Sequence, residues 1–214
     1  MHTIRKGEPR DIAAIAVIYD RILDREERGG ASTGWIRGVY PTADTARAAL
    51  EAGELFVMER EGRVVVAGRI NHEQCPQYAA VPWTEPETPD EQVLVLHTLV
   101  SDPLVAGHGC GTEFVAFYEQ YAREHGCTWL RIDTNARNVS ARRLYARLGY
   151  REVDIVPGKF NGIPDVQLVC MEKRVCPAAI SLPKTPPSGA AQPPAGGCFF
   201  YLVYLWILMD MFFV

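Results

Sequence analysis

The sequence predicts an α/β domain over residues 1–174, and three observations lead to this prediction. First, strand-like and helix-like hydrophobic patterns follow each other in the order β-α-α-β-β-β-α-β-α-β-β. Second, residues 91–100 form a nearly continuous apolar run, which is typical of a strand buried on both faces. Third, 48% of the 214 residues are hydrophobic and 22% are charged, as in a globular protein with a sizeable core.

Five elements are expected in the first half of this domain. They are a strand over residues 3–5, helices over residues 8–27 and 43–52, and strands over residues 55–59 and 64–70. The first helix carries an apolar stripe on one face and ends at Gly29-Gly30. Glu61-Gly62 lies between the two strands, where it is typical of a hairpin turn.

Six elements are expected in the second half, after a proline-rich loop over residues 72–90. They are a strand over residues 91–100, a helix that begins at the glycines of residues 107–111, a strand over residues 128–133, a helix over residues 139–148, and strands over residues 152–156 and 165–172. Gly149 directly follows the second of these helices, as expected for a helix end.

The C-terminal part differs in composition from the domain. Six of the 15 prolines lie within residues 175–194, which predicts a linker over residues 175–197. Residues 198–214 are apolar apart from Asp210, but as a helix they would extend only about 26 Å, less than the ~30 Å of a bilayer core. Three interpretations of residues 198–214 stay open. The favoured one is that the segment docks on the domain or on the partner of a homodimer. The other two are a marginal membrane anchor and an extension without function.

Charge and cysteine content exclude several classes of protein. The 22 Lys and Arg against 26 Asp and Glu give a net charge of -4, which argues against disorder and against a nucleic-acid partner. The six cysteines form no C-x-x-C pair, and no histidine cluster has the spacing of metal ligands, so neither disulfides nor a metal site are expected. The first residues lack the apolar run of a secretory signal, and we expect a cytoplasmic protein.

A glycine-rich loop, Gly107-His108-Gly109-Cys110-Gly111, lies between a predicted strand and a predicted helix. Such a loop turns backbone N–H groups and a helix N-terminus toward a phosphate, and glycine allows close approach of the backbone. A dinucleotide site would need a third glycine where Thr112 stands and an acidic residue about 20 positions on, where Asp133 lies. A tight turn without a ligand is the other alternative.

The segment from Asn138 to Tyr150 reads N-x-x-A-x-x-L-Y-x-x-x-G-Y and resembles the last motif block of the GNAT superfamily of N-acetyltransferases. The glycine loop is similar to the acetyl-CoA pyrophosphate loop of that family, R/Q-x-x-G-x-G/A. Ala106 stands where that loop usually begins with Arg or Gln, and residues 70–122 contain no Lys or Arg. The resemblance implies a GNAT-like fold, with a mixed, mostly antiparallel sheet of about seven strands and about four helices. It also implies acetyl-CoA as co-substrate and no metal.

The resemblance also assigns cofactor-binding residues. They are Leu99, Val100, Val105, Ala106, Gly107, His108, Gly109, Cys110, Gly111, Thr112, Asn138, Arg142 and Tyr145. Backbone N–H groups near Leu99 and Val100 would polarise the acetyl carbonyl. Arginines of the last helix, Arg142 among them, would offset the charge of the cofactor together with the loop amides and the helix dipole.

Tyr145 and His97 are the expected catalytic residues. Tyr145 lies two helical turns after Asn138 on the same face, and the corresponding tyrosine of the family commonly serves as general acid. The segment around His97 resembles the fourth-strand block of aralkylamine N-acetyltransferases, in which histidines relay the proton. Glu91 and ordered water are the alternative bases, and both Tyr145 and His97 also fit a purely structural place in the core.

Two loops with aromatic and acidic residues are placed to bind the acceptor, through Trp35, Tyr40 and Trp83. Aromatic rings beside carboxylates suit an amine that arrives protonated. The prediction is an N-acetyltransferase that moves an acetyl group from acetyl-CoA to a primary amine of a small molecule, by direct transfer in a ternary complex. A non-catalytic acyl-CoA-binding or regulatory module and an acetyltransferase of protein N-termini are the alternatives.

Overall fold

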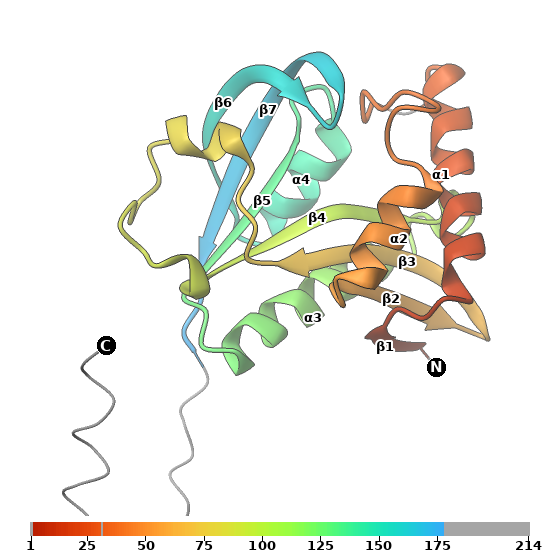
Figure 1. Cartoon of the computed structure of the whole chain (residues 1–214), viewed down its shortest axis with the longest axis horizontal. Helices are drawn as coiled ribbons and strands as arrows, with labels where there is room; N and C mark the ends of the chain where they lie inside the picture. Colours follow the sequence, from red (N-terminus) through yellow and green to blue (C-terminus); the bar gives the residue numbers. More distant parts are fainter. Residues whose placement is uncertain (1, 31, 178–214) are drawn as a thin grey trace, which may run out of the picture. The chain divides into compact units, whose positions relative to one another are not determined.

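The computed structural model describes residues 2–30 and 32–177. A seven-stranded sheet crosses this part of the chain in the order β1-β2-β3-β4-β5-β7-β6 (Figure 1). The strands are β1 (His2–Lys6), β2 (Leu55–Arg60), β3 (Arg63–Asn71), β4 (Val93–Ser101), β5 (Trp129–Asn135), β6 (Arg151–Phe160) and β7 (Ile163–Arg174). The pair β4–β5 is parallel, and the other five pairs are antiparallel. The apolar segment over residues 198–214 and the linker from residue 178 onward lie outside the described residues.

Four α-helices of the described residues flank the sheet, and together with it they confirm the predicted α/β fold. They are α1 (Asp11–Glu27), α2 (Ala43–Glu51), α3 (Cys110–Glu124) and α4 (Val139–Arg147). Three short 3-10 helices lie in the connections, η1 (Pro76–Ala80), η2 (Asp90–Gln92) and η3 (Pro103–Val105). Within the described residues, none of the helices combines the length and the apolar character that a bilayer crossing requires.

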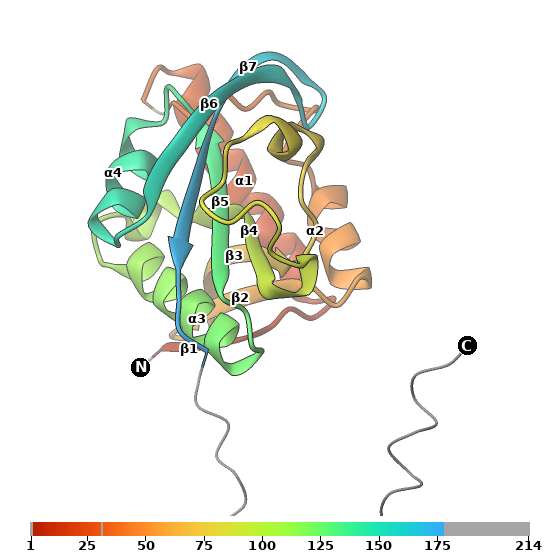
Figure 2. The same cartoon turned by 90° about the vertical axis from the view of Figure 1, so that its left-hand side faces the viewer.

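The last hairpin is longer than predicted. β6 and β7 pair up to a two-residue turn, Asn161-Gly162, in which both residues have positive φ angles of 49° and 81°. Such turns match the twist of the flanking strands, and Asn-Gly is their preferred sequence. Most of the loop expected between residues 156 and 165 is therefore strand. The lengthened end of the hairpin curves over the rest of the sheet (Figure 2).

Both faces of the sheet are buried. Side chains of β2 alternate between two clusters, since Phe56 and Met58 pack toward α3 whereas Leu55 and Val57 pack toward α1 and α2. A third cluster forms beneath residues 72–90 and the β6–β7 hairpin and includes Val93 and Val95 of β4. The core therefore has two layers of helices with the sheet between them, as in other α/β proteins.

The two parallel strands diverge partway along their length. Their pairing runs from Val93 opposite Trp129 to Leu96 opposite Ile132 and stops there. Beyond that point β4 continues beside β3, whereas β5 continues beside β7. The sheet is therefore open on one side of each strand from residues 97 and 133 onward.

β4 also bends at this point through a β-bulge. His97 lies opposite Arg69 and Val100 lies opposite Ala67, so two residues of β4 occupy the space opposite the single residue Gly68. One of these two, Thr98, has a φ of 50°, a backbone conformation that costs energy for a β-branched residue. The bulge takes the backbone of residues 98–99 out of register with β3.

Candidate active site

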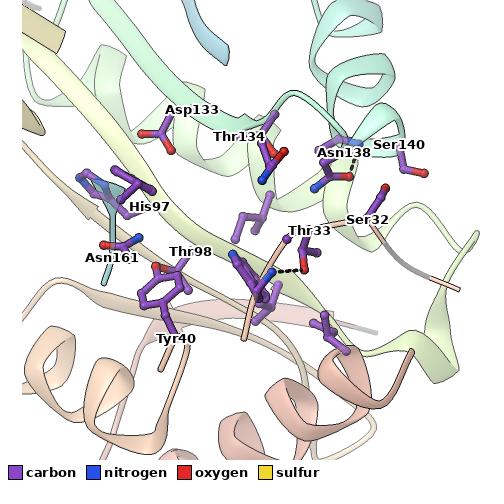
Figure 3. A pocket seen from close by; sticks show the side chains of 18 of the residues that line it. Ser32, Thr33, Tyr40, His97, Thr98, Asp133, Thr134, Asn138, Ser140 and Asn161 are labelled. Atoms are coloured by element: carbon purple, nitrogen blue, oxygen red, sulfur yellow. Dashed lines mark hydrogen bonds between the residues drawn. The ribbon is translucent and has the colours of Figure 1, made fainter. Parts of the chain in front are cut away.

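A cavity of about 910 Å³ lies where β4 and β5 diverge. Its walls come from the loop after α1, from β4 and β5, from α4 and from the β6–β7 hairpin. In Figure 3 the side chains of His97 and Asp133 lie at one side of the cavity, and those of Asn138 and Ser140 lie at the other. After the roles expected from the sequence, we call these sides the acceptor end and the cofactor end.

The glycine loop borders the cofactor end. Gly107 and Gly109 have φ angles of 84° and 78°, and Gly109 caps the N-terminus of α3. No backbone hydrogen bond within the described residues uses the N–H groups of residues 109–112. A Cβ atom at Gly107 would meet nothing within 4 Å. The loop therefore offers free donors and open space, which fits a phosphate group.

The cavity brings together only part of the predicted cofactor residues. Those that line it are Leu99, Val100, Ala106, Gly107, Asn138 and Tyr145. Those outside its lining are Val105, His108, Gly109, Cys110, Gly111, Thr112 and Arg142. Cys110, the first residue of α3, is buried in the core. The guanidinium of Arg142 donates to Glu152 at 2.7 and 2.8 Å and to the carbonyl of Ala136, so its charge is paired.

Arg25 is a cation at this cavity that the sequence reasoning missed. Arg21 of α1 forms an ion pair with Asp102, directly before η3. Arg25 lies one helical turn further on the same face, is exposed, and lines the cavity with Ala106 and Gly107. The spacing of Arg21 and Arg25 was visible in the sequence, but the packing of α1 beside the glycine loop was not.

Tyr145 lies on α4 with its ring buried and faces the cavity. Its ring packs edge-on against Tyr150, with 5.8 Å between the centroids. Burial, and to a lesser degree Asp133, raises the pKa of its phenol, so the hydroxyl stays protonated at neutral pH and can donate. Asn138 caps the same helix by accepting from the N–H of Ala141 at 3.2 Å, so it serves as a cap while it lines the cavity.

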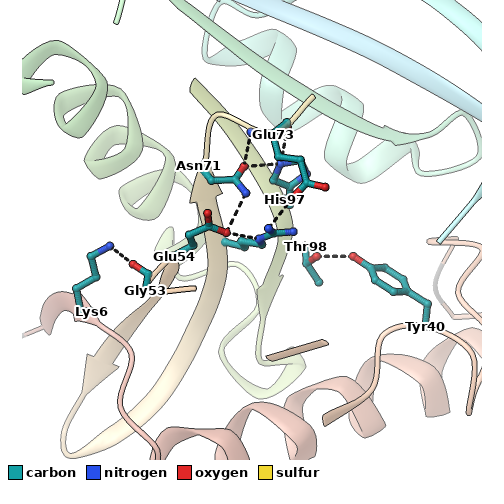
Figure 4. A network of polar contacts seen from close by, with 9 residues as sticks. Lys6, Tyr40, Gly53, Glu54, Asn71, Glu73, His97 and Thr98 are labelled. Atoms are coloured by element: carbon teal, nitrogen blue, oxygen red, sulfur yellow. Dashed lines mark hydrogen bonds and ion pairs between the residues drawn. The ribbon is translucent and has the colours of Figure 1, made fainter. Parts of the chain in front are cut away.

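His97 is held by a polar network that fixes its tautomer (Figure 4). Its Nε2 lies 2.9 Å from Oδ1 of Asn71 and 3.1 Å from the carbonyl oxygen of Glu73. Asn71 is oriented by its own Nδ2, which donates to Glu54 at 2.9 Å. Because both partners of Nε2 are acceptors, Nε2 carries the proton, and Nδ1 is an acceptor that no described residue uses. Burial, and then Arg69, lowers the pKa of His97 to about 4, so the ring is neutral at pH 7.

Asp133 shares the acceptor end with His97. Leu96 and Ile132 are the last paired residues of β4 and β5, so His97 and Asp133 occupy the first open position and point to the same face of the sheet. The carboxylate accepts a hydrogen bond from the hydroxyl of Tyr78 at 2.8 Å. Burial raises the pKa of Asp133 to about 6. From the sequence, Asp133 stood out only by its spacing from the glycine loop, as the acidic residue of a dinucleotide site, because the strand register is not visible in the sequence.

The predicted acceptor residues separate into two groups. Trp35 and Tyr40 line the cavity, and their rings meet edge-on at 5.8 Å. Trp83 is only 7% exposed and lies outside the lining. Its indole N–H donates to the carbonyl of Tyr78 at 3.0 Å, and its ring lies 4.0 Å from the guanidinium of Arg131. The structure therefore places Trp83 where it anchors the loop of residues 72–90.

Glu91, the alternative base, lies in η2 before the start of β4 and is exposed outside the cavity. The β6–β7 hairpin instead contributes Phe160, Asn161 and Ile163 to the acceptor end. Sequence reasoning missed these three residues, although the Asn161-Gly162 pair is a recognisable hairpin signal. Among residues 2–30 and 32–177 there is no group of three or more His, Cys, Asp or Glu side chains that could hold a metal ion.

Comparisons with known proteins identify a family for this chain. The family model described as the acetyltransferase (GNAT) family matches residues 21–150. The uncharacterised N-acetyltransferase YycN of Bacillus subtilis (strain 168) is 32% identical over 75 residues, which cover 35% of this chain and 47% of YycN. The match thus spans about half the length of that relative.

Solved structures share the fold at low sequence identity. A GNAT-family acetyltransferase from Streptococcus agalactiae 2603 superposes with a TM-score of 0.68 at 18% identity, covering 81% of this chain and 95% of that one. The putative acetyltransferase yncA of Salmonella typhimurium, solved with acetyl-CoA, gives a TM-score of 0.59 at 18% identity, covering 83% and 98%. These similarities support the same arrangement of sheet and helices.

Proposed function

Because the chain belongs to the acetyltransferase (GNAT) family, we propose that it is an N-acetyltransferase that moves an acetyl group from acetyl-CoA to a primary amine of a small molecule. The transfer is direct and takes place in a ternary complex. The observation that carries this proposal is that Tyr145, His97 and Asp133 line one cavity, at the divergence of β4 and β5 and beside a loop with free N–H donors.

The cofactor end fits acetyl-CoA. The free N–H groups of residues 109–112 and the N-terminus of α3 would hold its pyrophosphate. Arg25 would supply the positive charge that an Arg at the position of Ala106 would otherwise give. Acetyl-CoA supplies an acyl group activated as a thioester, and one of the solved relatives in this fold was obtained with acetyl-CoA.

At the acceptor end, Asp133 and His97 act on the amine. An amine arrives protonated at neutral pH and must lose a proton before it can attack. Asp133, with its pKa raised to about 6, is mostly ionised at pH 7 and can still accept that proton. Neutral His97 orients the amine or a bridging water through its free Nδ1, because a pKa of about 4 makes it a weak base.

The opposite side of the reaction centre stabilises the developing charges. The bulge in β4 takes Thr98 and Leu99 out of register with β3, and we assign the N–H of Leu99 to the oxygen of the acetyl carbonyl. The protonated hydroxyl of Tyr145 donates to the leaving sulfur from α4. Both donors are fixed in place before the substrates bind, which lowers the cost of reorganisation.

The test is the release of free thiol from acetyl-CoA, measured with a panel of small amines and with peptides that carry a free N-terminus. Acetyl-CoA binding is measured in parallel by calorimetry. Turnover with small amines supports the proposal. Cofactor binding without turnover on any acceptor would instead indicate a binding module, and turnover on the peptides alone would overturn the assignment to small molecules.

A further inference from the structure

The acceptor end of the cavity has an apolar wall. Phe160 at the end of β6 and Ile163, Val166 and Leu168 of β7 line it, and Trp35 faces it from the loop after α1. Ile163, Val166 and Leu168 belong to the buried cluster beneath the hairpin, and Phe160 and Trp35 pack against that cluster. The wall is therefore a continuation of the core, and an apolar group bound there would gain about 25 cal/mol for each Å² removed from water.

Charges at the same end are distributed unevenly. Arg69 is the only cation of the described residues at this end, and it is paired with Glu54 and Glu73 at 2.7 Å each. Asp133 receives one hydrogen bond, from Tyr78, and no ion pair from the described residues. A carboxylate or phosphate on the acceptor would find no free cation here, whereas an ammonium would find an unpaired carboxylate.

We propose that the acceptor is a primary monoamine with an apolar substituent and without a carboxylate or phosphate, its ammonium resting against Asp133. This inference rests on the proposed N-acetyltransferase function and narrows its substrate class. The ammonium would lie at the apex of the divergent strands, beside His97, and the substituent would extend along Phe160 toward the wall of β7.

The inference also accounts for the environment of Asp133. Burial raises the pKa of this carboxyl, which means that ionisation is disfavoured in the free protein. An ammonium in contact would favour the ionised form again. Amine binding should therefore weaken as the pH falls through about 6, where Asp133 becomes protonated.

The first experiment compares matched acceptors on the full-length wild-type protein. Phenethylamine is compared with phenylalanine, which adds a carboxylate, and hexylamine is compared with hexamethylenediamine, which adds a second ammonium. We expect kcat/KM to be about tenfold or more higher for the apolar monoamine of each pair, because a buried unpaired charge is costly. Equal or better use of phenylalanine or of the diamine overturns the inference while N-acetyltransferase activity stands.

The second experiment measures binding rather than turnover. Calorimetry of phenethylamine with the protein saturated by CoA should show a Kd raised about tenfold in Asp133→Asn, with the Kd for acetyl-CoA unchanged. Asp154→Asn, on the exposed part of β6, is the matched control and should bind like the wild type. Unchanged amine binding in Asp133→Asn overturns the inference.

Phe160→Ala tests the apolar wall separately. It should raise KM for phenethylamine and leave KM for ethylamine unchanged, because ethylamine is too short to reach the wall. An equal effect on both amines overturns the assignment of the wall to the substituent. If no amine binds or reacts although acetyl-CoA binds, the proposed function fails together with this inference.

Discussion

Tyr145, His97 and Asp133 line one cavity. Burial shifts the pKa of each side chain in the direction that favours its neutral form. The pKa values of the phenol and of the carboxyl rise, and that of the imidazole falls, because each charged form loses hydration. The consequence is a division of roles. Tyr145 remains a donor, His97 remains neutral, and Asp133 is the one of the three that titrates near physiological pH.

The pH dependence of turnover distinguishes the two candidate bases. In the proposed mechanism the carboxylate of Asp133 is the active form, so kcat/KM, which reports the pKa values of the free enzyme, should fall as the pH drops through about 6 and be fully retained above it. His97→Gln should keep this acid limb at a lower rate, whereas Asp133→Asn should lose the limb along with most of the activity. Rate profiles from pH 5 to 9 provide the measurement. A limb that disappears in His97→Gln but persists in Asp133→Asn would assign the base to His97.

Tyr145→Phe isolates the hydroxyl from the ring. Because the ring packs against Tyr150 and the substitution removes only the hydroxyl, the variant should fold normally and bind acetyl-CoA as the wild type does. We expect kcat to fall about 10²-fold, the usual loss for a missing acid–base group. Tyr150→Phe is the control and should keep its rate, because the hydroxyl of Tyr150 is buried and has no hydrogen-bond partner among the described residues. Unchanged turnover in Tyr145→Phe would leave Tyr145 with a structural role only.

At the scale of elements, the site depends on the divergence of one strand pair. β4 and β5 separate after Leu96 and Ile132 because each continues along a different neighbour. α1 and α4 contribute the opposite walls of the opening, and the β6–β7 hairpin contributes its acceptor end. A helix distant in sequence from the glycine loop can therefore contribute charge to it.

Arg25 tests this contribution of α1. Arg25→Gln should raise the Kd for acetyl-CoA about fivefold and reduce its dependence on salt, because one phosphate contact is lost. Arg28→Gln is the matched control, since Arg28 is exposed at the same helix end outside the cavity. Adding Ala106→Arg to Arg25→Gln should restore affinity. Calorimetry that finds the same Kd in Arg25→Gln and wild type would contradict the assignment.

At the scale of the molecule, the cavity lies between two parts of the core. On one face of β4, Val93 and Val95 belong to the cluster under the hairpin, and Val100 belongs to the cluster under α1 and α2. His97 lies between them on the same strand, where neither cluster closes over the sheet. The fold thus surrounds a polar site with apolar packing on both sides.

Removal of residues 178–214 should leave the domain intact. The core clusters and the cavity described above are formed by residues 2–30 and 32–177, so the truncated protein should fold and keep the acetyl-CoA affinity of the full chain. Removal from residue 175 onward is the control, because Val175 is 5% exposed and its N–H donates to the carbonyl of Thr128. That variant should lose ~1–3 kcal/mol of stability. A protein ending at residue 177 that folds but no longer binds acetyl-CoA would contradict the prediction.

Local patterns were enough to predict most of the fold. The order of strands and helices, the glycine turn before α3 and the motif from Asn138 to Tyr150 are all written in neighbouring residues. Hydrophobic period and turn chemistry are local properties, so they survive in the sequence. The extent of the last hairpin could also have been predicted, because Asn161-Gly162 is a local signal.

Tertiary structure alone decided which of these residues meet. Asp133 faces His97 because of the parallel register of β4 and β5, and Arg25 lines the same cavity as Gly107 because α1 packs beside η3. Trp83 turned inward because a buried guanidinium and a carbonyl were available to its indole. Such contacts join residues tens of positions apart, and their geometry follows from the packing of the whole core rather than from any local pattern.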